Sequence, residues 1–278
     1  MPDHPRCSVL IPGDWSTRTG GYAYDRRLVL ALRDAGWQID VHALDGRWPW
    51  PGAATLGAAE RLFDQLPDAR CVVADGLAFG AMPDLVTAHA ERLCWVALVH
   101  HPLHLETGLD GPARLALRAG EARALQAARQ VVVTSPATAR DVAAMGVPAA
   151  RIAVVEPGTD PVPPGHSGDG AGRAGGGPLQ LLCVATLTPR KGHVLLLQAL
   201  QGLAALPWTL HCVGSPDRDP VTAAHLHRLG CSLGLAARVH WHGELDAAAL
   251  QARYAAADLF VLPSLHEGYG MVVAEALA

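Results

Sequence analysis

The chain has 278 residues, half of them hydrophobic, and a formal net charge of −4 at pH 7. This length favours about two domains, and the hydrophobic content is ample for a buried core in each. The negative net charge argues against a nucleic-acid-binding protein, because no global basic field attracts a polyanion. No stretch approaches the ~18–20 apolar residues of a membrane span, and the first residues lack the apolar core of a signal peptide.

The cysteine pattern indicates a reduced compartment. Six cysteines are present and none forms a CxxC pair. Five lie inside apolar runs, such as Cys71 in ARCVVAD and Cys183 in LQLLCVAT. We expect buried thiols that pack as small hydrophobes. Because disulfides are rare in the cytosol, a cytoplasmic location is the default expectation.

Residues 1–162 alternate between two kinds of segment. Short runs rich in Val, Ile and Leu are typical of buried strands, and they occur at 6–11, 37–44, 70–75, 93–100, 130–135 and 151–157. Ala- and Leu-rich stretches of helical length lie between them, at 22–35, 55–66 and 112–129. Strands that are apolar on both faces and alternate with helices indicate a parallel sheet covered on both sides. We therefore expect a Rossmann-like, doubly wound α/β domain.

A Pro- and Gly-rich segment without hydrophobic periodicity follows, and it predicts a flexible linker at 163–178. The alternation then restarts, with strands expected at 179–186, 208–215, 238–243 and 257–264 and helices at 193–206, 223–233 and 247–256. These elements predict a second Rossmann-like domain over 179–278. Because doubly wound domains normally continue with further βα units, we expect this domain to be incomplete and the sequence to be partial.

Two carboxylates near the end of the sequence are the first candidate site residues. Glu267 follows the predicted strand DLFVLPS, and Glu275 lies inside the next helix. Gly268 and Gly270 permit a tight turn after Glu267. In an open α/β sheet, ligands bind at the carboxyl ends of the strands, where carboxylates can accept hydrogen bonds from sugar and ribose hydroxyls. The alternative is a turn residue and an ordinary helix charge.

Two adjacent cations begin the second predicted domain. Arg190 and Lys191 lie where the strand 179–186 gives way to a helix expected to start near Lys191. Cations are unfavourable at a helix N-terminus, whereas anions bind there. A diphosphate would explain the pair, and the alternative is two solvent-exposed basic residues.

The first predicted domain has weaker signals at the same edge. Gly20 and Gly21 lie between the first strand and the first helix, where glycine lets the backbone approach a phosphate or sugar. His100 and His101 end a buried strand, and a histidine there can hydrogen-bond a sugar hydroxyl. Each feature also has a plain structural explanation, as a strand–helix turn or a capped turn before Pro102.

Several other patterns carry less weight. The GxGxxG match at 170–175 precedes a strand instead of following one, so it does not predict a dinucleotide site. His240 and His242 share one face of a short strand, but no third ligand is evident, and no metal site is predicted. The arginines of the helix at 113–129 are interpreted as a solvated face, with contact to an anionic membrane as the alternative.

In this order, these segments resemble the retaining glycosyltransferases of family 4, which have the GT-B fold. The resemblance covers nearly the whole chain. Its most specific part is the E-x7-E block from Glu267 to Glu275, preceded by DLFVLPSLHEGYG, and VATLTPRKG and VVEPGTD also look like this family. It implies an N-terminal domain that binds the acceptor, a C-terminal domain that binds the nucleotide sugar, and a catalytic cleft between them.

The resemblance also implies residue roles. Arg190 and Lys191 match the pair that neutralises the donor diphosphate, Glu275 the carboxylate that holds the ribose hydroxyls, and Glu267 the carboxylate near the donor sugar. Gly20 and Gly21 match the N-terminal glycine loop, and His100 matches the histidine near the donor sugar, with His101 as a rival. The residues expected at the donor site are thus Gly20, Gly21, Arg190, Lys191, Glu267, Gly268 and Glu275, and those expected in catalysis are His100, Glu267, Arg190 and Lys191.

We accordingly expect a metal-independent hexosyltransferase without a cofactor. It would transfer a sugar from a nucleotide-diphosphate sugar to a hydroxyl of a glycan, lipid or small molecule, with retention of configuration. No nucleic-acid partner is expected, and a location at the inner face of the membrane is an open alternative to the bulk cytoplasm. The alternatives in function are a nucleotide-sugar epimerase or a phosphorylase on the same fold, and a non-catalytic sugar-nucleotide-binding fragment.

Overall fold

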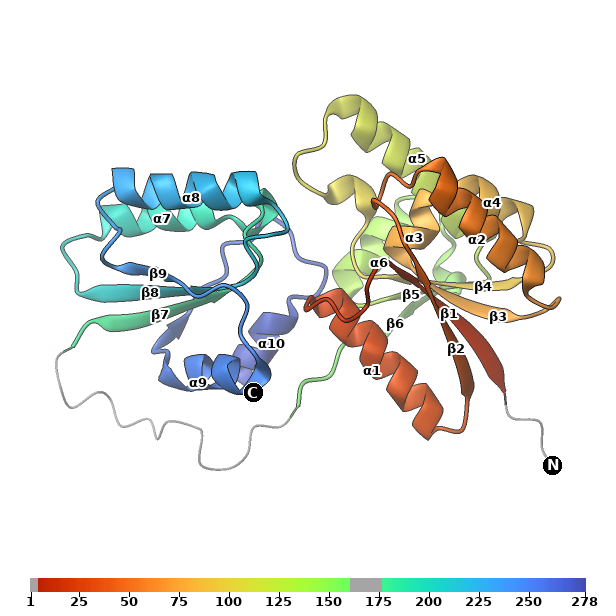
Figure 1. Cartoon of the computed structure of the whole chain (residues 1–278), viewed down its shortest axis with the longest axis horizontal. Coiled ribbons are helices and arrows are strands. Elements are labelled where there is room, and N and C mark those ends of the chain that lie inside the picture. Colours follow the sequence, from red (N-terminus) through yellow and green to blue (C-terminus); the bar gives the residue numbers. More distant parts are fainter. Residues whose placement is uncertain (1–4, 161–176) are drawn as a thin grey trace. The chain divides into compact units, whose positions relative to one another are not determined.

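The computed structural model describes residues 5–160 and 177–278. The chain divides into two compact units, Met1–Pro157 and Gly158–Ala278. Each is a parallel α/β unit, as the alternation of strands and helices predicted (Figure 1). Of the predicted linker, 163–178, all but residues 177 and 178 lie outside the described residues.

The first unit is built on a six-stranded parallel sheet with the order β2-β1-β3-β4-β5-β6. Strand order reverses between β1 and β3, which is the arrangement of a doubly wound fold. The strands are β1 (Arg6–Pro12), β2 (Gln38–Leu44), β3 (Cys71–Asp75), β4 (Cys94–Val99), β5 (Gln130–Val133) and β6 (Ile152–Val154).

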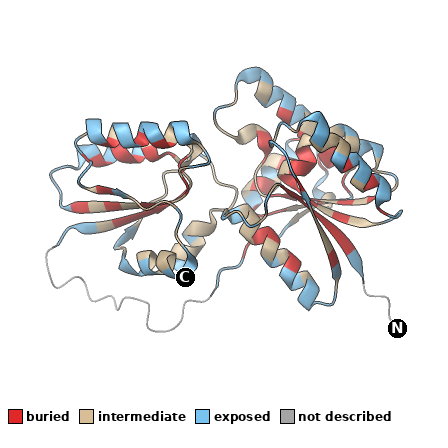
Figure 2. Cartoon of the chain, in the orientation of Figure 1, coloured by how far each residue is buried: buried red, intermediate tan, exposed pale blue. Residues whose placement is uncertain are grey.

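Helices cover both faces of this sheet (Figure 1). They are α1 (Gly20–Asp34), α2 (Ala53–Gln65), α3 (Gly76–Ala81), α4 (Pro83–Ala88), α5 (Gly111–Ala127) and α6 (Pro136–Ala143), with single 3-10 turns at Leu103–Leu105 and Ala149–Arg151. On one face, Val29 of α1 packs against alternate residues of β1. On the other, Phe63 of α2 and Leu125 of α5 join Trp95 of β4 in the main core. The central strands are therefore covered on both faces, whereas the edge strands β2 and β6 are only partly buried (Figure 2).

The second unit has a four-stranded parallel sheet with the order β10-β7-β8-β9. Its strands are β7 (Leu179–Val184), β8 (Trp208–Val213), β9 (Val239–Trp241) and β10 (Leu259–Phe260). Its helices are α7 (His193–Gly202), α8 (Pro220–Ser232), α9 (Ala247–Ala256) and α10 (Met271–Leu277), with a 3-10 turn at Pro189–Lys191. Helices α7 and α8 lie on one face of the sheet and α9 and α10 on the other (Figure 1).

The two faces of this second sheet have different cores. Leu197 of α7 and Leu226 of α8 pack against Leu210 of β8 in the larger core. A smaller core on the opposite face joins Leu182 and Val213 to partly buried residues of α9 and α10. Neither α9 nor α10 contains a fully buried residue.

The structure differs from the predicted elements in three respects. The strand expected at 257–264 is only two residues long and pairs with β7 alone, at the edge of the sheet. Helix α7 begins at His193, so the two cations precede it in a separate 3-10 turn. Helices α3, α4 and α6 were not predicted. None of the helices in the described part of the chain has the length and apolar character that a bilayer span requires.

Candidate active site

In the second unit, two loops at the carboxyl edge of the sheet are joined to each other. Gly192 has a left-handed backbone (φ +69°), and a Cβ there would lie 2.1 Å from the carbonyl oxygen of Pro263. Only glycine fits this approach. The backbone N–H of Leu265 donates to the carbonyl of Arg190 at 2.8 Å. The loop after β7 and the loop after β10 therefore form one continuous surface.

This surface holds an ion pair between two of the predicted site residues. Lys191 Nζ lies 2.6 Å from Glu267 Oε1, and the two side chains are 15% and 24% exposed. Arg190 donates from Nη1 to the carbonyl of His266 at 3.0 Å and lies 3.9 Å from Glu267 Oε2. The structure thus brings Arg190 and Lys191 to Glu267, although Lys191 and Glu267 are 76 positions apart in the sequence. Lys191 is also the only lysine in the sequence.

The electrostatics of this cluster keep Glu267 ionised. Burial raises the pKa of its carboxyl, but the charge and hydrogen bond of Lys191 and the charge of Arg190 together lower that pKa below its ordinary value. In this cluster, one carboxylate faces two cations. Such an arrangement can bind an anion with two negative charges without losing its internal ion pair.

Glu275 lies in a different environment from Glu267. It is part of α10, and its Oε2 accepts a hydrogen bond of 2.9 Å from the hydroxyl of Tyr254 in α9. Burial, followed by the charge of Glu275 and this hydrogen bond, raises the pKa of Tyr254, so its phenol stays protonated and donates. Tyr254 therefore orients a half-buried carboxylate, which was not expected from the sequence. Gly268 lies in the loop between Glu267 and α10.

In the first unit, the glycine pair and a histidine come together. Gly20 and Gly21 are the first two residues of α1, not a loop before it, and Thr19 caps the helix by accepting from Tyr22 N. His100 directly follows β4. A Cβ at Gly21 would lie 3.3 Å from the His100 ring, so the helix start and the histidine are in close contact. His101 lies 4.0 Å from Glu106 through its Nε2.

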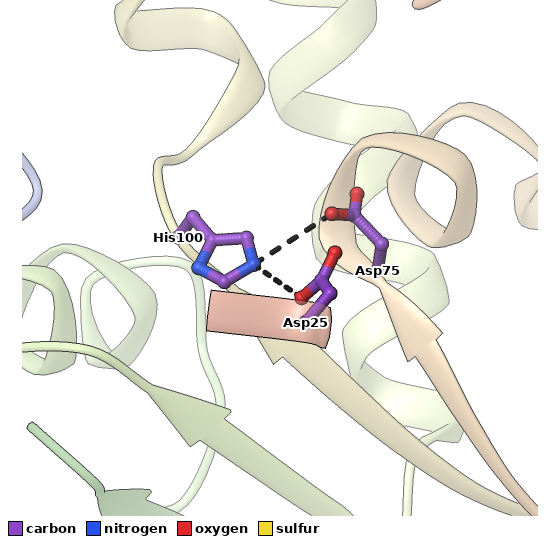
Figure 3. A group of neighbouring side chains, drawn as sticks. All are labelled: Asp25, Asp75 and His100. Atoms are coloured by element: carbon purple, nitrogen blue, oxygen red, sulfur yellow. Dashed lines mark hydrogen bonds and ion pairs between the residues drawn. The ribbon is translucent and has the colours of Figure 1, made fainter. Parts of the chain in front are cut away.

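His100 faces two buried carboxylates (Figure 3). Its Nε2 lies 2.8 Å from Oδ1 of Asp25 and 3.7 Å from Oδ2 of Asp75, and the Asp25 side chain is only 1% exposed. Asp75 caps α3 by accepting from Leu77 N at 2.7 Å. The ring of Tyr24 meets His100 edge to face, with centroids 5.3 Å apart. Carboxylates therefore hold the ring on one side and an aromatic ring contacts it on another.

Protons are shared unequally in this cluster. Burial and the neighbouring Asp25 raise the pKa of Asp75 to about 7, although His100 lowers it. Burial lowers the pKa of His100, but the hydrogen bond to Asp25 and the charges of both carboxylates outweigh it and raise that pKa. Nε2 of His100 consequently carries a proton toward Asp25, and Nδ1 points away from both carboxylates (Figure 3). Nδ1 is thus the ring nitrogen available to an external partner.

The same three side chains have the composition of a cation site. Asp25, Asp75 and His100 each offer one ligand atom, and these atoms lie within 4.8 Å of one another. The 2.8 Å contact between nitrogen and oxygen is a normal hydrogen-bond distance, however, and a shared proton accounts for it. The sequence missed Asp25, because it lies within a helix 75 positions from His100. Asp75 ends the strand CVVAD, and this position was a usable signal.

Both units match known glycosyltransferase families. Residues 20–162 match the family described as Glycosyltransferase Family 4, and residues 178–278 match Glycosyl transferases group 1. A D-inositol 3-phosphate glycosyltransferase of Catenulispora acidiphila is 30% identical over 181 residues, which are 61% of this chain and 42% of that protein. The chain therefore spans less than half the length of this curated relative.

Two solved structures illustrate the similarity in fold. Sucrose-phosphate synthase from Thermosynechococcus elongatus superposes with a TM-score of 0.77 at 20% identity, covering 99% of this chain and 79% of that one. Anabaena HepE, solved in complex with UDP and glucose, gives a TM-score of 0.71 at 18% identity, covering 99% and 78%. With the family match over more than half of its residues, the chain belongs to glycosyltransferase family 4 and has the GT-B fold.

Proposed function

We propose that this protein is a retaining hexosyltransferase that uses a nucleotide-diphosphate sugar as donor and needs no metal ion. The observation that carries the proposal is the cluster of Arg190, Lys191 and Glu267 at the carboxyl edge of the second sheet. A guanidinium and an ammonium side by side are the groups that bind phosphate oxygens. Further support comes from Anabaena HepE, which shares the fold and has been solved in complex with UDP-glucose.

In this proposal, Arg190 and Lys191 stabilise the leaving diphosphate. The bond between the anomeric carbon and the diphosphate oxygen breaks first, and its electron pair stays on that oxygen. An ammonium has three N–H donors, so Lys191 can bind a phosphate oxygen while it contacts Glu267. Because these cations are held in place before the reaction, they stabilise the developing charge without reorganisation.

The acceptor hydroxyl then attacks from the face that the diphosphate leaves, and configuration is retained. The new bond forms between the acceptor oxygen and the anomeric carbon, and the hydroxyl proton passes to the leaving diphosphate oxygen. Glu267, which is ionised, faces the oxocarbenium-like centre or a donor-sugar hydroxyl. Glu275, oriented by Tyr254, accepts hydrogen bonds from the ribose hydroxyls.

His100 acts on the donor sugar through Nδ1. The hydrogen bond to Asp25 fixes the ring, and the raised pKa of His100 favours the form in which Nδ1 also carries a proton. In that form Nδ1 donates to a sugar oxygen. We further propose that Asp25 and Asp75 share protons with His100 and do not bind a catalytic cation, so transfer should continue in EDTA.

The single lysine provides a direct test. Biosynthetic labelling with [ε-13C]lysine gives one labelled side chain, Lys191, and leaves its three N–H donors unmodified, so a single NMR signal is expected. UDP and UDP-glucose should shift the Lys191 signal, whereas uridine should not. Arg190→Ala should weaken the response at least tenfold, and Arg228→Ala, an exposed control on α8, should leave it unchanged. No shift at millimolar UDP, ADP or GDP would refute the diphosphate site.

Donor turnover separates the proposed activity from its alternatives. Release of nucleoside diphosphate that requires an acceptor hydroxyl supports transfer, and product NMR should show the donor's anomeric configuration. Isomerisation of the donor without any acceptor would instead indicate an epimerase. Diphosphate binding without turnover would indicate a non-catalytic module.

A further inference from the structure

Three histidines meet on the face of the second sheet that carries α9 and α10. His211 lies on β8 and is the register partner of His240 on β9, and His242 follows β9. The rings of His211 and His240 stack with centroids 5.2 Å apart, and those of His211 and His242 do the same. The sequence shows only the pair His240 and His242, because the third histidine belongs to the neighbouring strand.

A hydrogen-bond chain fixes the tautomer of the central histidine. Gln180 donates from its amide nitrogen to the carbonyl of Pro178 at 2.8 Å, which orients its amide oxygen toward His211. That oxygen lies 2.9 Å from Nε2 of His211, so Nε2 carries the proton. The lone pair of His211 is then on Nδ1, which faces Nε2 of His242 at 2.9 Å. Metal-binding histidines are typically held in this way, through their other ring N–H.

One neighbour of the cluster opposes a metal ion. The guanidinium of Arg253 on α9 is close enough to His211 and His242 to act on both rings, and its positive charge disfavours a bound cation.

We propose that His211 Nδ1 and His242 Nε2, with His240 as third ligand, bind a divalent transition-metal ion of the zinc class. Two nitrogens bound to one tetrahedral ion at ~2.0–2.1 Å are about 3.4 Å apart, so the observed pair needs to open only slightly. The ring nitrogens of the three histidines are not gathered as closely as the ligand atoms of Asp25, Asp75 and His100, so the site requires the exposed side chain of His240 to rotate toward the other two. Water occupies the fourth position. The proton now on His242 Nε2 moves to Nδ1 of the same ring. Metal binding to the neutral histidines therefore releases no proton to the solvent.

This metal site would be separate from the proposed transferase chemistry. Its ligands belong to β8 and to the end of β9, and none of them is among the residues assigned to donor binding or catalysis. A metal there would join β9, which is an edge strand of the sheet, to β8. We therefore expect binding to raise the unfolding temperature of the protein and to leave the proposed transfer reaction intact.

The test uses the full chain without an affinity tag, washed with EDTA and exchanged into chelator-free buffer at pH 7.5. Isothermal titration with Zn²⁺ should show one site per chain, and Co²⁺ should give the intense visible bands of a tetrahedral complex. His211→Ala and His242→Ala should each weaken Zn²⁺ binding at least tenfold. Gln180→Ala should weaken it about tenfold, through the loss of the partner that holds the ring.

Two control variants make the result specific. His225→Ala removes an exposed histidine on α8, and His100→Ala removes the histidine beside Asp25 and Asp75. Both should bind Zn²⁺ like the unmodified chain. If His211→Ala does not fold in EDTA, His242→Gln, at the end of β9, serves in its place. Unchanged affinity in the His242 variant, no binding at 100-fold excess Zn²⁺, or loss of binding only in His100→Ala would overturn the proposal.

Discussion

Lys191→Ala removes an ammonium with two roles: the ion pair with Glu267 seen in the structure, and the proposed stabilisation of the leaving diphosphate. It balances Glu267 at 2.6 Å, while Arg190 approaches the same carboxylate only to 3.9 Å. At an effective dielectric constant of 20, Coulomb's law gives about 6 kcal/mol for the shorter contact and about 4 kcal/mol for the longer. Desolvation cancels most of this, and removing one partner of a buried pair costs about 3–5 kcal/mol. Because Arg190 remains, we expect the free energy of unfolding to fall by about 3 kcal/mol.

The double variant Lys191→Ala/Glu267→Gln distinguishes stability from catalysis. Without a buried carboxylate to balance, most of the lost unfolding free energy should return. Turnover should nevertheless stay about 100- to 1,000-fold below that of the unmodified protein, because a charge that stabilises the leaving group is absent. Urea unfolding of the second unit measures the free energy of unfolding, and initial rates of donor consumption measure turnover. Titration calorimetry with UDP measures the affinity for the diphosphate.

The reasoning has two points at which it can fail. Near-normal turnover in Lys191→Ala would show that the ammonium does not act on the diphosphate. A double variant as unstable as the single one would show that the ion pair is not the source of the lost stability. Glu267→Gln alone is the matched control, and it should still bind UDP.

Three further predictions concern other residues. Because the pKa of Asp75 is raised to about 7, the folded chain holds a proton that the unfolded chain releases near pH 4. The free energy of unfolding of the first unit should therefore fall as pH rises from 4 to 7. Asp75→Asn should flatten this pH dependence in urea titrations, and an unchanged slope would contradict the assignment. Tyr254→Phe should lower the unfolding free energy of the second unit by about 1.5 kcal/mol, because Glu275 loses its donor; equal midpoints in urea would argue otherwise. Gly192→Ala should cost more than about 2 kcal/mol, combining left-handed strain with a clash against Pro263, and a thermal midpoint within a degree of normal would rule out this close approach.

Most of the fold could be predicted from the sequence because both sheets are parallel and buried. Strands covered on both faces become continuous apolar runs, and nine of the ten strands were expected close to their observed positions, while β10 is much shorter than expected. Helix α6 was missed although Ser135 and Pro136 form a capping signal, since the helix is only eight residues long. Short helices have too few turns for a clear period.

The sequence predicted individual residues of the candidate site but not the contacts between them. Glu267 and Lys191 were identified separately, but their ion pair depends on the two loops meeting across 76 positions. The sequence suggested a diphosphate, or simple exposure to solvent, as the reason for two cations before a helix, whereas in the structure Glu267 balances part of their charge. Asp25 was missed because no local pattern marks a carboxylate that a distant strand brings to His100.

The join between the loops after β7 and β10 has a consequence for engineering. The two loops pack as one structural unit, although they are far apart in the sequence. The close approach of Gly192 to Pro263 and the backbone hydrogen bond from Leu265 to Arg190 hold them together. Changing one segment alone, for example by grafting a relative's loop to alter donor preference, would pair two surfaces that were not shaped together. Chimeras that exchange residues 186–193 and 261–270 as a pair should keep their expression and folding, while chimeras of either segment alone should lose them.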